Sequence, residues 1–247
     1  MNTVLKFIPN SITCLNLLCG CFAIALSFRA TEMVCCGLTG WQLSMIFIFA
    51  AAVFDFLDGF VARILHAYSD LGKELDSLSD LVSFGVAPAF MLFNIINDLH
   101  SGHHTPWTHY LVFLIPVMGA WRLGRFNVRD AAGDNSVFHG LPIPANALFW
   151  IGYVNWVWKY GLPDDYIVAI GILLVSLAMV SNLVLPSLKF KNLKIKDNLG
   201  RYFIIIVSVA LVAVFGLSGL TWAIVIYLVM GVFTRAPIQN TSKSNDD

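Results

Sequence analysis

The chain has 247 residues, of which 58% are hydrophobic and 12% are charged, and its formal net charge at pH 7 is zero. Soluble domains average about 25% charged and about 45–50% apolar residues, so this composition excludes an ordinary water-soluble domain. Because a chain without net charge has no overall field that attracts a polyanion, we expect no nucleic-acid partner.

Apolar runs along the chain predict helices that cross a membrane, each of which needs roughly 20 residues. The runs cover about 12–28, 41–63, 76–97, 109–126, 144–161, 166–185, 202–216 and 220–234. The sequence GLSG at 216–219 is a turn signal, so it predicts a helical hairpin over 202–234. We therefore expect an all-α, polytopic membrane protein of about eight transmembrane helices, built as one membrane domain over 1–247 with a polar tail at 235–247.

The basic residues predict how these helices are oriented in the membrane. If the N-terminus is cytoplasmic, all of the 15 Lys and Arg residues except Arg29 and Lys159 fall in inner segments. Because inner loops of membrane proteins are enriched in Lys and Arg, we expect a multi-pass protein of the cytoplasmic (inner) membrane with both termini on the cytoplasmic side.

Two polar segments leave alternatives open. The segment 187–201 alternates lysines with apolar residues, which fits a contact with the anionic inner leaflet of the bilayer and fits a solvated inner loop equally well. The predicted outer loop after the third span carries His100, His103, His104 and His109. These histidines could bind a transition metal, but we favour a polar surface loop.

Four aspartates stand where a membrane protein tolerates charge least. Asp55 and Asp58 end the second predicted span three residues apart, so their carboxylates share one face of a helix. Gly59 and Ala62 extend this face, and neither has a side chain that would stop a flat group from approaching the backbone.

A matching stripe opens the third predicted span. Gly72, Asp76 and Asp80 repeat at intervals of four residues, which places them on one helix face. The link between the two spans is short, so we expect the second and third helices to be antiparallel neighbours with their acidic faces together.

The cost of clustering four carboxylates points to bound cations, since Arg63 and Lys73 are too few to neutralise them. Hard oxygen ligands without His or Cys suit Mg²⁺ or Mn²⁺, which bridge carboxylates to substrate phosphates. Two such ions could clamp a phosphoryl group during in-line displacement. A buried ion-pair network and a proton or cation relay in a transporter stay as alternatives.

The spacing D-x2-D-G-x2-A-R-x8-G-x3-D-x3-D over residues 55–80 resembles the signature of the CDP-alcohol phosphotransferases at every fixed position. The segments 9–20, 121–128 and 138–147 resemble the serine-using branch of that family. The resemblance implies a six-helix catalytic core over about 7–185 with extra helices after it. It also implies transfer of phosphatidyl from CDP-diacylglycerol to L-serine, with release of CMP, by a protein that is commonly a homodimer.

By this resemblance, Asp55, Asp58, Asp76 and Asp80 would ligate two divalent cations, and Asp80 would also be the general base. The residues implied to bind CDP-diacylglycerol are Asn10, Thr13, Asp58, Gly59, Ala62, Arg63 and Gly72.

The acceptor site has weaker support. Arg122, Arg125 and Arg129 share one helix face that could hold the carboxylate of serine, the phosphate of glycerol 3-phosphate or that of an inositol phosphate. The spacing does not choose among these acceptors. Similarity to the serine-using branch does, and it makes Arg122, Arg125 and Asn127 the candidates for the serine site.

Overall fold

The computed structural model of the chain describes residues 3–100, 106–131, 140–183, 185 and 195–233. Helices make up almost all of it, which confirms the predicted all-α fold. The described residues include one small two-stranded hairpin, in which β1 (Met33–Cys35) pairs antiparallel with β2 (Leu38–Thr39). The helices follow in this order: α1 (Thr3–Ser27), α2 (Gly40–Ile64), α3 (Asp70–Asp80), α4 (Ala87–Leu99), α5 (Leu114–Ala131), α6 (Ile143–Tyr160), α7 (Asp165–Val180), α8 (Ile195–Phe215) and α9 (Gly219–Phe233).

Three short helical segments join or extend these helices. A π-helix, η1 (Leu81–Val86), makes α3, η1 and α4 one continuous rod, and a 3₁₀-helix, η2 (Trp107–Phe113), leads into α5. The 3₁₀ turn η3 (Gly216–Ser218) lies between α8 and α9, where the chain reverses and the two helices contact each other.

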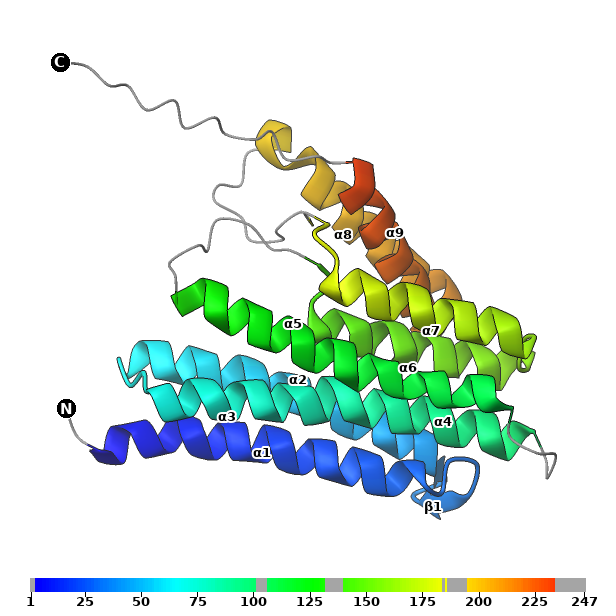
Figure 1. Cartoon of the computed structure of the whole chain (residues 1–247), viewed down its shortest axis with the longest axis horizontal. Coiled ribbons are helices and arrows are strands. Elements are labelled where there is room, and N and C mark those ends of the chain that lie inside the picture. The colour runs from blue at the N-terminus through cyan, green and yellow to red at the C-terminus, as the bar shows by residue number, and fades with distance from the viewer. Residues whose placement is uncertain (1–2, 101–105, 132–139, 184, 186–194, 234–247) are drawn as a thin grey trace.

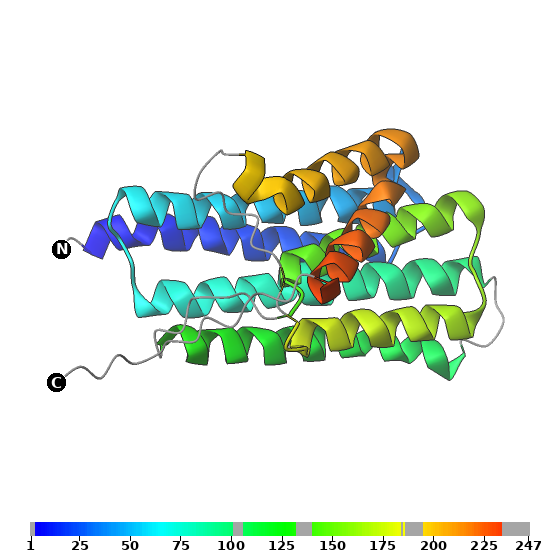
Figure 2. The same ribbon diagram turned by 90° about the horizontal axis from the view of Figure 1, so that it is seen from above.

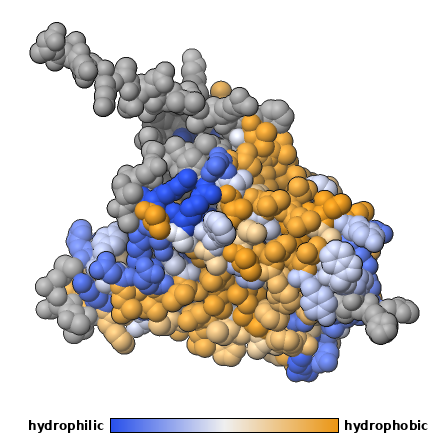
Figure 3. All heavy atoms as spheres, viewed as in Figure 1, coloured by the Kyte–Doolittle hydropathy of each residue, from blue (hydrophilic) through white to orange (hydrophobic). Residues whose placement is uncertain are grey.

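The first seven helices run side by side along the long axis of the molecule, while α8 and α9 lean against one flank (Figures 1 and 2). One end of this bundle holds the start of α1, the α2–α3 link and the end of α5. The other end holds β1, the end of α4 and the start of α7. Hydrophobic residues cover the middle of the surface in view and hydrophilic residues gather toward the two ends (Figure 3), as expected for a membrane-spanning bundle.

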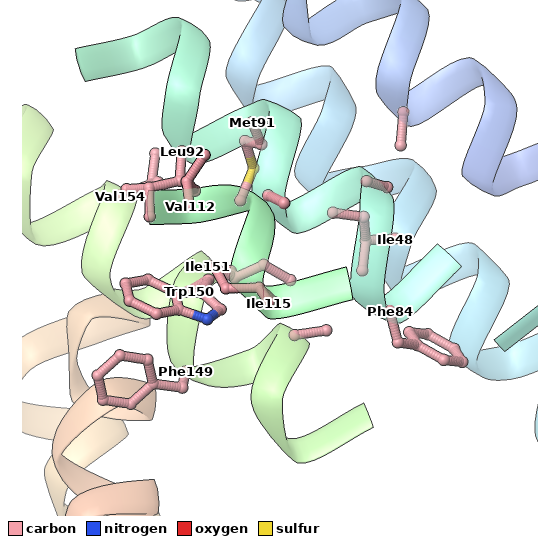
Figure 4. Packing of buried hydrophobic residues seen from close by; sticks show 14 of the residues in the cluster. Ile48, Phe84, Met91, Leu92, Val112, Ile115, Phe149, Trp150, Ile151 and Val154 are labelled. Atoms are coloured by element: carbon pink, nitrogen blue, oxygen red, sulfur yellow. The ribbon is translucent and has the colours of Figure 1, made fainter. Parts of the chain in front are cut away.

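The core lies where α2, α4, α5, α6 and α7 meet, and Figure 4 shows its side chains from close by. Its largest fully buried side chains include Trp41, Trp150, Phe84, Met91 and Ile115. Tight interdigitation of this kind fixes the helices that carry the polar end of the bundle.

Helix α1 packs against both α2 and the α3–η1 rod, and this packing builds one wall of the polar end. A β-carbon on Gly20 would come within 2.5 Å of Ser83 Oγ, so only glycine allows the two helices to approach this closely. The hydroxyl of Ser83 donates to the carbonyl of Asn16 (3.0 Å), and Ser79 Oγ donates to the carbonyl of Thr13 (3.2 Å). These bonds fix the register of α1 along the third span.

The π-helix begins directly after Asp80. A π-helical turn leaves a backbone carbonyl without its usual partner, and such turns concentrate at functional sites. The Nδ2 atom of Asn146 donates to Phe84 O in this turn (3.0 Å), while its Oδ1 atom accepts from Trp150 Nε1 (2.9 Å). Asn146 is fully buried, and both of its side-chain polar atoms therefore bond within the core.

Five stretches of the described residues are long and apolar enough to cross a membrane by length and composition. They are Leu5–Ser27, Gly40–Ile64, Asp70–Leu99, Trp107–Arg129 and Leu199–Val232, the last of which covers most of α8 and of α9. Helix α7 is shorter but also apolar. These stretches together make the protein a multi-pass membrane protein. The division into core, hairpin and tail stays a proposal. Residues 187–194 of the lysine-rich segment and the tail at 235–247 lie outside the described residues.

Candidate functional site

Three of the four predicted aspartates form one cluster at the polar end of the bundle. Asp55 comes from the last turns of α2, and Asp76 and Asp80 come from α3, with one carboxylate oxygen of each within 4.8 Å of the others. Asp58 is 6% exposed and accepts a hydrogen bond from Thr13 Oγ1 at 2.6 Å. The hydroxyl therefore ties this carboxylate to α1.

Asp80 is the least satisfied member of the cluster. Its Oδ1 atom is buried and has no hydrogen-bond partner. Arg122 on α5 lies close enough to attract the Asp80 carboxylate electrostatically, yet Arg122 Nε is also buried without a partner. A buried polar atom without a hydrogen-bond partner lowers the stability of a protein. The atoms Asp80 Oδ1 and Arg122 Nε therefore indicate a place where further groups bind.

A cavity of about 460 Å³ lies beside the cluster and opens between the ends of α2 and α3. Its predicted lining residues are Asn10, Thr13, Asp55, Asp58, Gly59, Ala62, Gly72, Asp76 and Asn127, and the residues Pro9, Ala67, Tyr68, Ser69, Lys73 and Phe126 complete it. Six of the seven residues expected to bind the nucleotide thus meet in one space. The exception is Arg63, which is exposed and donates from Nε to Gly59 O at 2.9 Å.

The helices around the cavity differ from the expectation in two respects. Helices α2 and α3 were expected to be direct neighbours, but α1 packs against both and the cavity occupies the space between their ends. The first span was expected from about residue 12, but α1 begins at Thr3 and continues through Pro9, so Asn10 lies inside the helix together with Thr13. Their placement inside a helix turns both side chains into the same cavity.

The two predicted glycines shape this cavity in different ways. A β-carbon on Gly59 would meet no atom within 4 Å, so the backbone of α2 is open to the cavity there. A β-carbon on Gly72 would come within 2.8 Å of Asn10 Oδ1 and 3.0 Å of Ser69 Oγ. Gly72 therefore allows α1 to approach the first turn of α3, where Ser69 Oγ caps the helix by accepting from Gly72 N (3.0 Å).

We expect Gly59→Ala to raise the KM for the substrate that fills this cavity by about 10-fold or more, while the protein folds normally. The added methyl group meets open space, and alanine stabilises a helix by about 1 kcal/mol relative to glycine. Steady-state kinetics and thermal unfolding measure the two effects. The matched control is Gly171→Ala on α7, where the methyl group also meets nothing within 4 Å; equal kinetics in the two variants would contradict the role of Gly59.

The three acceptor candidates on α5 separate in the structure. Asn127 lines the cavity and donates from Nδ2 to Ser77 Oγ (2.9 Å), and Arg122 does not line it but lies close enough to Asp80 for electrostatic attraction. The guanidinium of Arg125 instead donates to Val180 O (2.8 Å) and Asn182 Oδ1 (2.6 Å) at the end of α7. Arg122 and Asn127 are thus brought to the site, whereas Arg125 fastens α5 to α7.

The residues present fit divalent cations. Carboxylate oxygens are the ligands that Mg²⁺ and Mn²⁺ prefer, and three of them converge here with one oxygen lacking any partner. Lys73 also lines the cavity, but one cation does not balance four carboxylates.

Several lining residues are not predicted from the sequence, among them Ser69, Tyr68 and Phe126. Ser69 carried a detectable signal, because a serine three residues before Gly72 and at the start of a helix is a typical N-cap. Tyr68 and Phe126 carried none, since only the packing of the link and α5 brings these two aromatic side chains to one cavity.

Comparison with known proteins gives a consistent result. The model of the family described as CDP-alcohol phosphatidyltransferase matches residues 6–185. The chain is 36% identical over 169 residues to a Methanocaldococcus jannaschii protein named CDP-diacylglycerol--serine O-phosphatidyltransferase, covering 68% of this chain and 71% of that protein. A protein of the same name from Helicobacter pylori (strain J99) is 31% identical over 237 residues, covering 92% of this chain and 90% of that protein.

Proposed function

The chain belongs to the CDP-alcohol phosphatidyltransferase family, and we propose how its site transfers a phosphatidyl group from CDP-diacylglycerol to L-serine. The products are phosphatidylserine and CMP. The observation that carries this function is the carboxylate cluster beside a cavity that opens at the polar end of a membrane bundle. This position lets a nucleotide headgroup reach the carboxylates while its acyl chains stay in the bilayer.

The cavity residues are proposed to hold the cytidine diphosphate part of the lipid. Gly59 and Ala62 leave room for a flat group against α2, while Asn10 and Thr13 present polar atoms from α1. Arg63 does not line this cavity and donates from Nε to Gly59 O, so the support for its contact with the nucleotide phosphates is the family resemblance alone.

Two divalent cations, Mg²⁺ or Mn²⁺, are the proposed cofactors. Asp55, Asp58, Asp76 and Asp80 would hold them, with the Asp58 carboxylate fixed by Thr13. When bound, these cations neutralise the phosphates of the liponucleotide and the charge that develops during displacement.

Asp80 is proposed to act as the general base. It accepts the hydroxyl proton of serine while the serine oxygen forms a bond to the phosphorus that carries diacylglycerol. The bond from this phosphorus to the CMP oxygen breaks, and CMP leaves with the bonding electron pair. Positioning of the two substrates in line accounts for much of the acceleration of such a transfer.

Arg122 and Asn127 are the proposed contacts of the acceptor. Arg122 lies beside Asp80 and has a free Nε–H, so it can donate to the serine carboxylate while the serine hydroxyl faces the base. Arg125 is proposed to act indirectly, by holding α5 in place through its bonds to the end of α7.

The membrane placement of the site follows from the same proposal. The inner segments hold nearly all Lys and Arg residues when the carboxylate cluster faces the cytoplasm, where soluble serine and CMP are exchanged. We also propose a homodimer, on the ground of the family resemblance. Chemical cross-linking in native membranes tests whether two chains associate.

The experiment that tests the function is an acceptor screen on the purified protein in detergent with CDP-diacylglycerol and Mg²⁺ or Mn²⁺. We expect CMP release that requires both L-serine and the cation. Release that requires glycerol 3-phosphate or inositol 1-phosphate instead would keep the phosphatidyl transfer and overturn serine as acceptor. No release with any acceptor would overturn the enzyme assignment and favour the transporter alternative.

A further inference from the structure

A second group of metal-ligating side chains lies at the end of the bundle opposite the carboxylate cluster. His100 directly follows α4, His109 lies in η2, and Asp165 is the first residue of α7. One ligand atom from each residue lies within 4.8 Å of the others. Figure 1 shows that the end of α4 and the start of α7 meet at this end, far from the α2–α3 link.

Both imidazole rings converge on one carboxylate oxygen. Asp165 Oδ1 lies 3.2 Å from His100 Nε2 and 2.9 Å from His109 Nε2, and the ring centroids are 4.8 Å apart in an edge-to-face arrangement. In a tetrahedral zinc site with bonds of about 2.0–2.1 Å, neighbouring ligand atoms are separated by about 3.3–3.4 Å. The two imidazole–carboxylate distances, 3.2 and 2.9 Å, therefore lie within about 0.5 Å of the separation that such an ion requires.

The second nitrogen of His100 determines which atom faces the carboxylate. Its Nδ1 lies 3.0 Å from the carbonyl oxygen of Ile96, which can only accept a hydrogen bond, so Nδ1 carries the proton. In the neutral ring, Nε2 then presents a lone pair to Asp165 Oδ1, which is another acceptor. A cation between these two atoms removes the conflict, and a ring N–H donated to a backbone carbonyl is the usual arrangement of a metal-bound histidine.

The surroundings suit an ion that is held firmly and still reached from water. His109 is 1% exposed and packs into the bundle, whereas the side chains of His100 and Asp165 are 22% and 29% exposed. One side of the site is thus rigid and the other is open to a water molecule as a fourth ligand. Two imidazoles with one carboxylate are a ligand set that zinc accepts and that Mg²⁺ does not favour.

We propose that His100, His109 and Asp165 form a structural site for a zinc-like transition-metal ion, which ties α4, η2 and α7 together on the outer side of the bundle. The site is separate from the carboxylate cluster and plays no part in the transfer reaction. Of the four histidines in the predicted outer loop, His103 and His104 lie outside the described residues, and the site does not depend on them. The sequence alone favours a polar surface loop over a metal site here.

The test uses the full-length protein in detergent, stripped with a chelator and then dialysed against zinc in the presence of excess Mg²⁺. Mass spectrometry of the bound metal gives the zinc content, and visible absorption after loading with Co²⁺ reports a tetrahedral nitrogen and oxygen site. The test variants are His100→Ala and Asp165→Asn, which change partly exposed residues. The matched controls are His66→Asn, whose left-handed backbone (φ 47°) asparagine tolerates, and Asp164→Asn, which keeps the helix cap.

We expect the parent protein and both controls to retain one zinc per chain that excess Mg²⁺ does not displace. Each test variant should bind zinc at least about 10-fold more weakly and lose the Co²⁺ absorption bands. Zinc should raise the melting temperature of the parent but not of the test variants. Asp55→Ala should keep the zinc, which separates this proposal from the proposed transfer reaction. Equal zinc content in parent and test variants, or none in either, would overturn the proposal.

Discussion

Replacing Asp80 by asparagine should lower the rate of CMP release at saturating substrates by about 10²–10⁴-fold, the usual contribution of a positioned general base. The asparagine side chain has nearly the same shape and can keep an oxygen in the position of Oδ2, but it cannot accept the hydroxyl proton. The buried Oδ1 atom of Asp80 has no partner in the protein, so the substitution breaks no hydrogen bond that it makes. Pre-steady-state and steady-state measurements of CMP release give the rate.

Binding of CDP-diacylglycerol in the presence of the cation should change much less than turnover in Asp80→Asn. Asp98→Asn is the matched control, because Asp98 lies in α4 of the same rod and accepts two hydrogen bonds from Thr31 at the opposite end of the bundle. Turnover close to that of the parent would show that Asp80 is not the base. A parallel loss of liponucleotide binding would show instead that Asp80 acts mainly as a ligand of the cation.

Replacing Asp55 by alanine should shift the cation dependence itself. Asp55 is the residue of α2 that lies close to both Asp76 and Asp80, so its removal leaves Asp58 as the one proposed ligand from α2. We expect the Mg²⁺ or Mn²⁺ concentration for half-maximal activity to rise at least about 10-fold, with partial recovery at high concentration. Titration of activity against each cation measures the shift, and curves that superimpose on those of the parent would remove Asp55 from the ligand set.

A stability measurement without cations separates this effect from misfolding. Asp55 carries like charge to its two neighbours, and removing one of several crowded carboxylates relieves their repulsion. The melting temperature of Asp55→Ala in chelator should therefore equal or exceed that of the parent.

The two variants should also respond differently to the cation. In Asp80→Asn, added cation should restore little activity, since the missing function there is proton transfer.

Much of the candidate site was predictable because helical periodicity fixes which side chains share a face. The intervals between Asp55 and Asp58 and between Gly72, Asp76 and Asp80 predicted two acidic stripes, and the structure brings Asp55, Asp76 and Asp80 together. The all-α membrane fold was predictable from composition and run length. Neither inference requires knowledge of contacts between distant helices.

The features that sequence reasoning missed all depend on such contacts. Nothing in the local sequence shows that Arg125 bonds to the end of α7, or that α1 packs against both α2 and α3. The role of Asn146 was equally hidden, since its partner is a carbonyl that only the π-helix makes available. Helix starts also escaped prediction where a polar stretch with a proline, as at Pro9, continues as a helix.

The π-helix after Asp80 affects whether the α3–η1–α4 rod tolerates the insertion or deletion of one residue. An α-helix rotates by about 100° per residue, so inserting or deleting one residue normally turns everything beyond it to a different face. The π-helical turn at Leu81–Val86 absorbs one residue within an unbroken rod. Deleting one residue there would return this turn to α-helical geometry and leave Asp76 and Asp80 in the same orientation relative to the buried side of α4. A deletion elsewhere in the rod would instead rotate the acidic end away from the cluster.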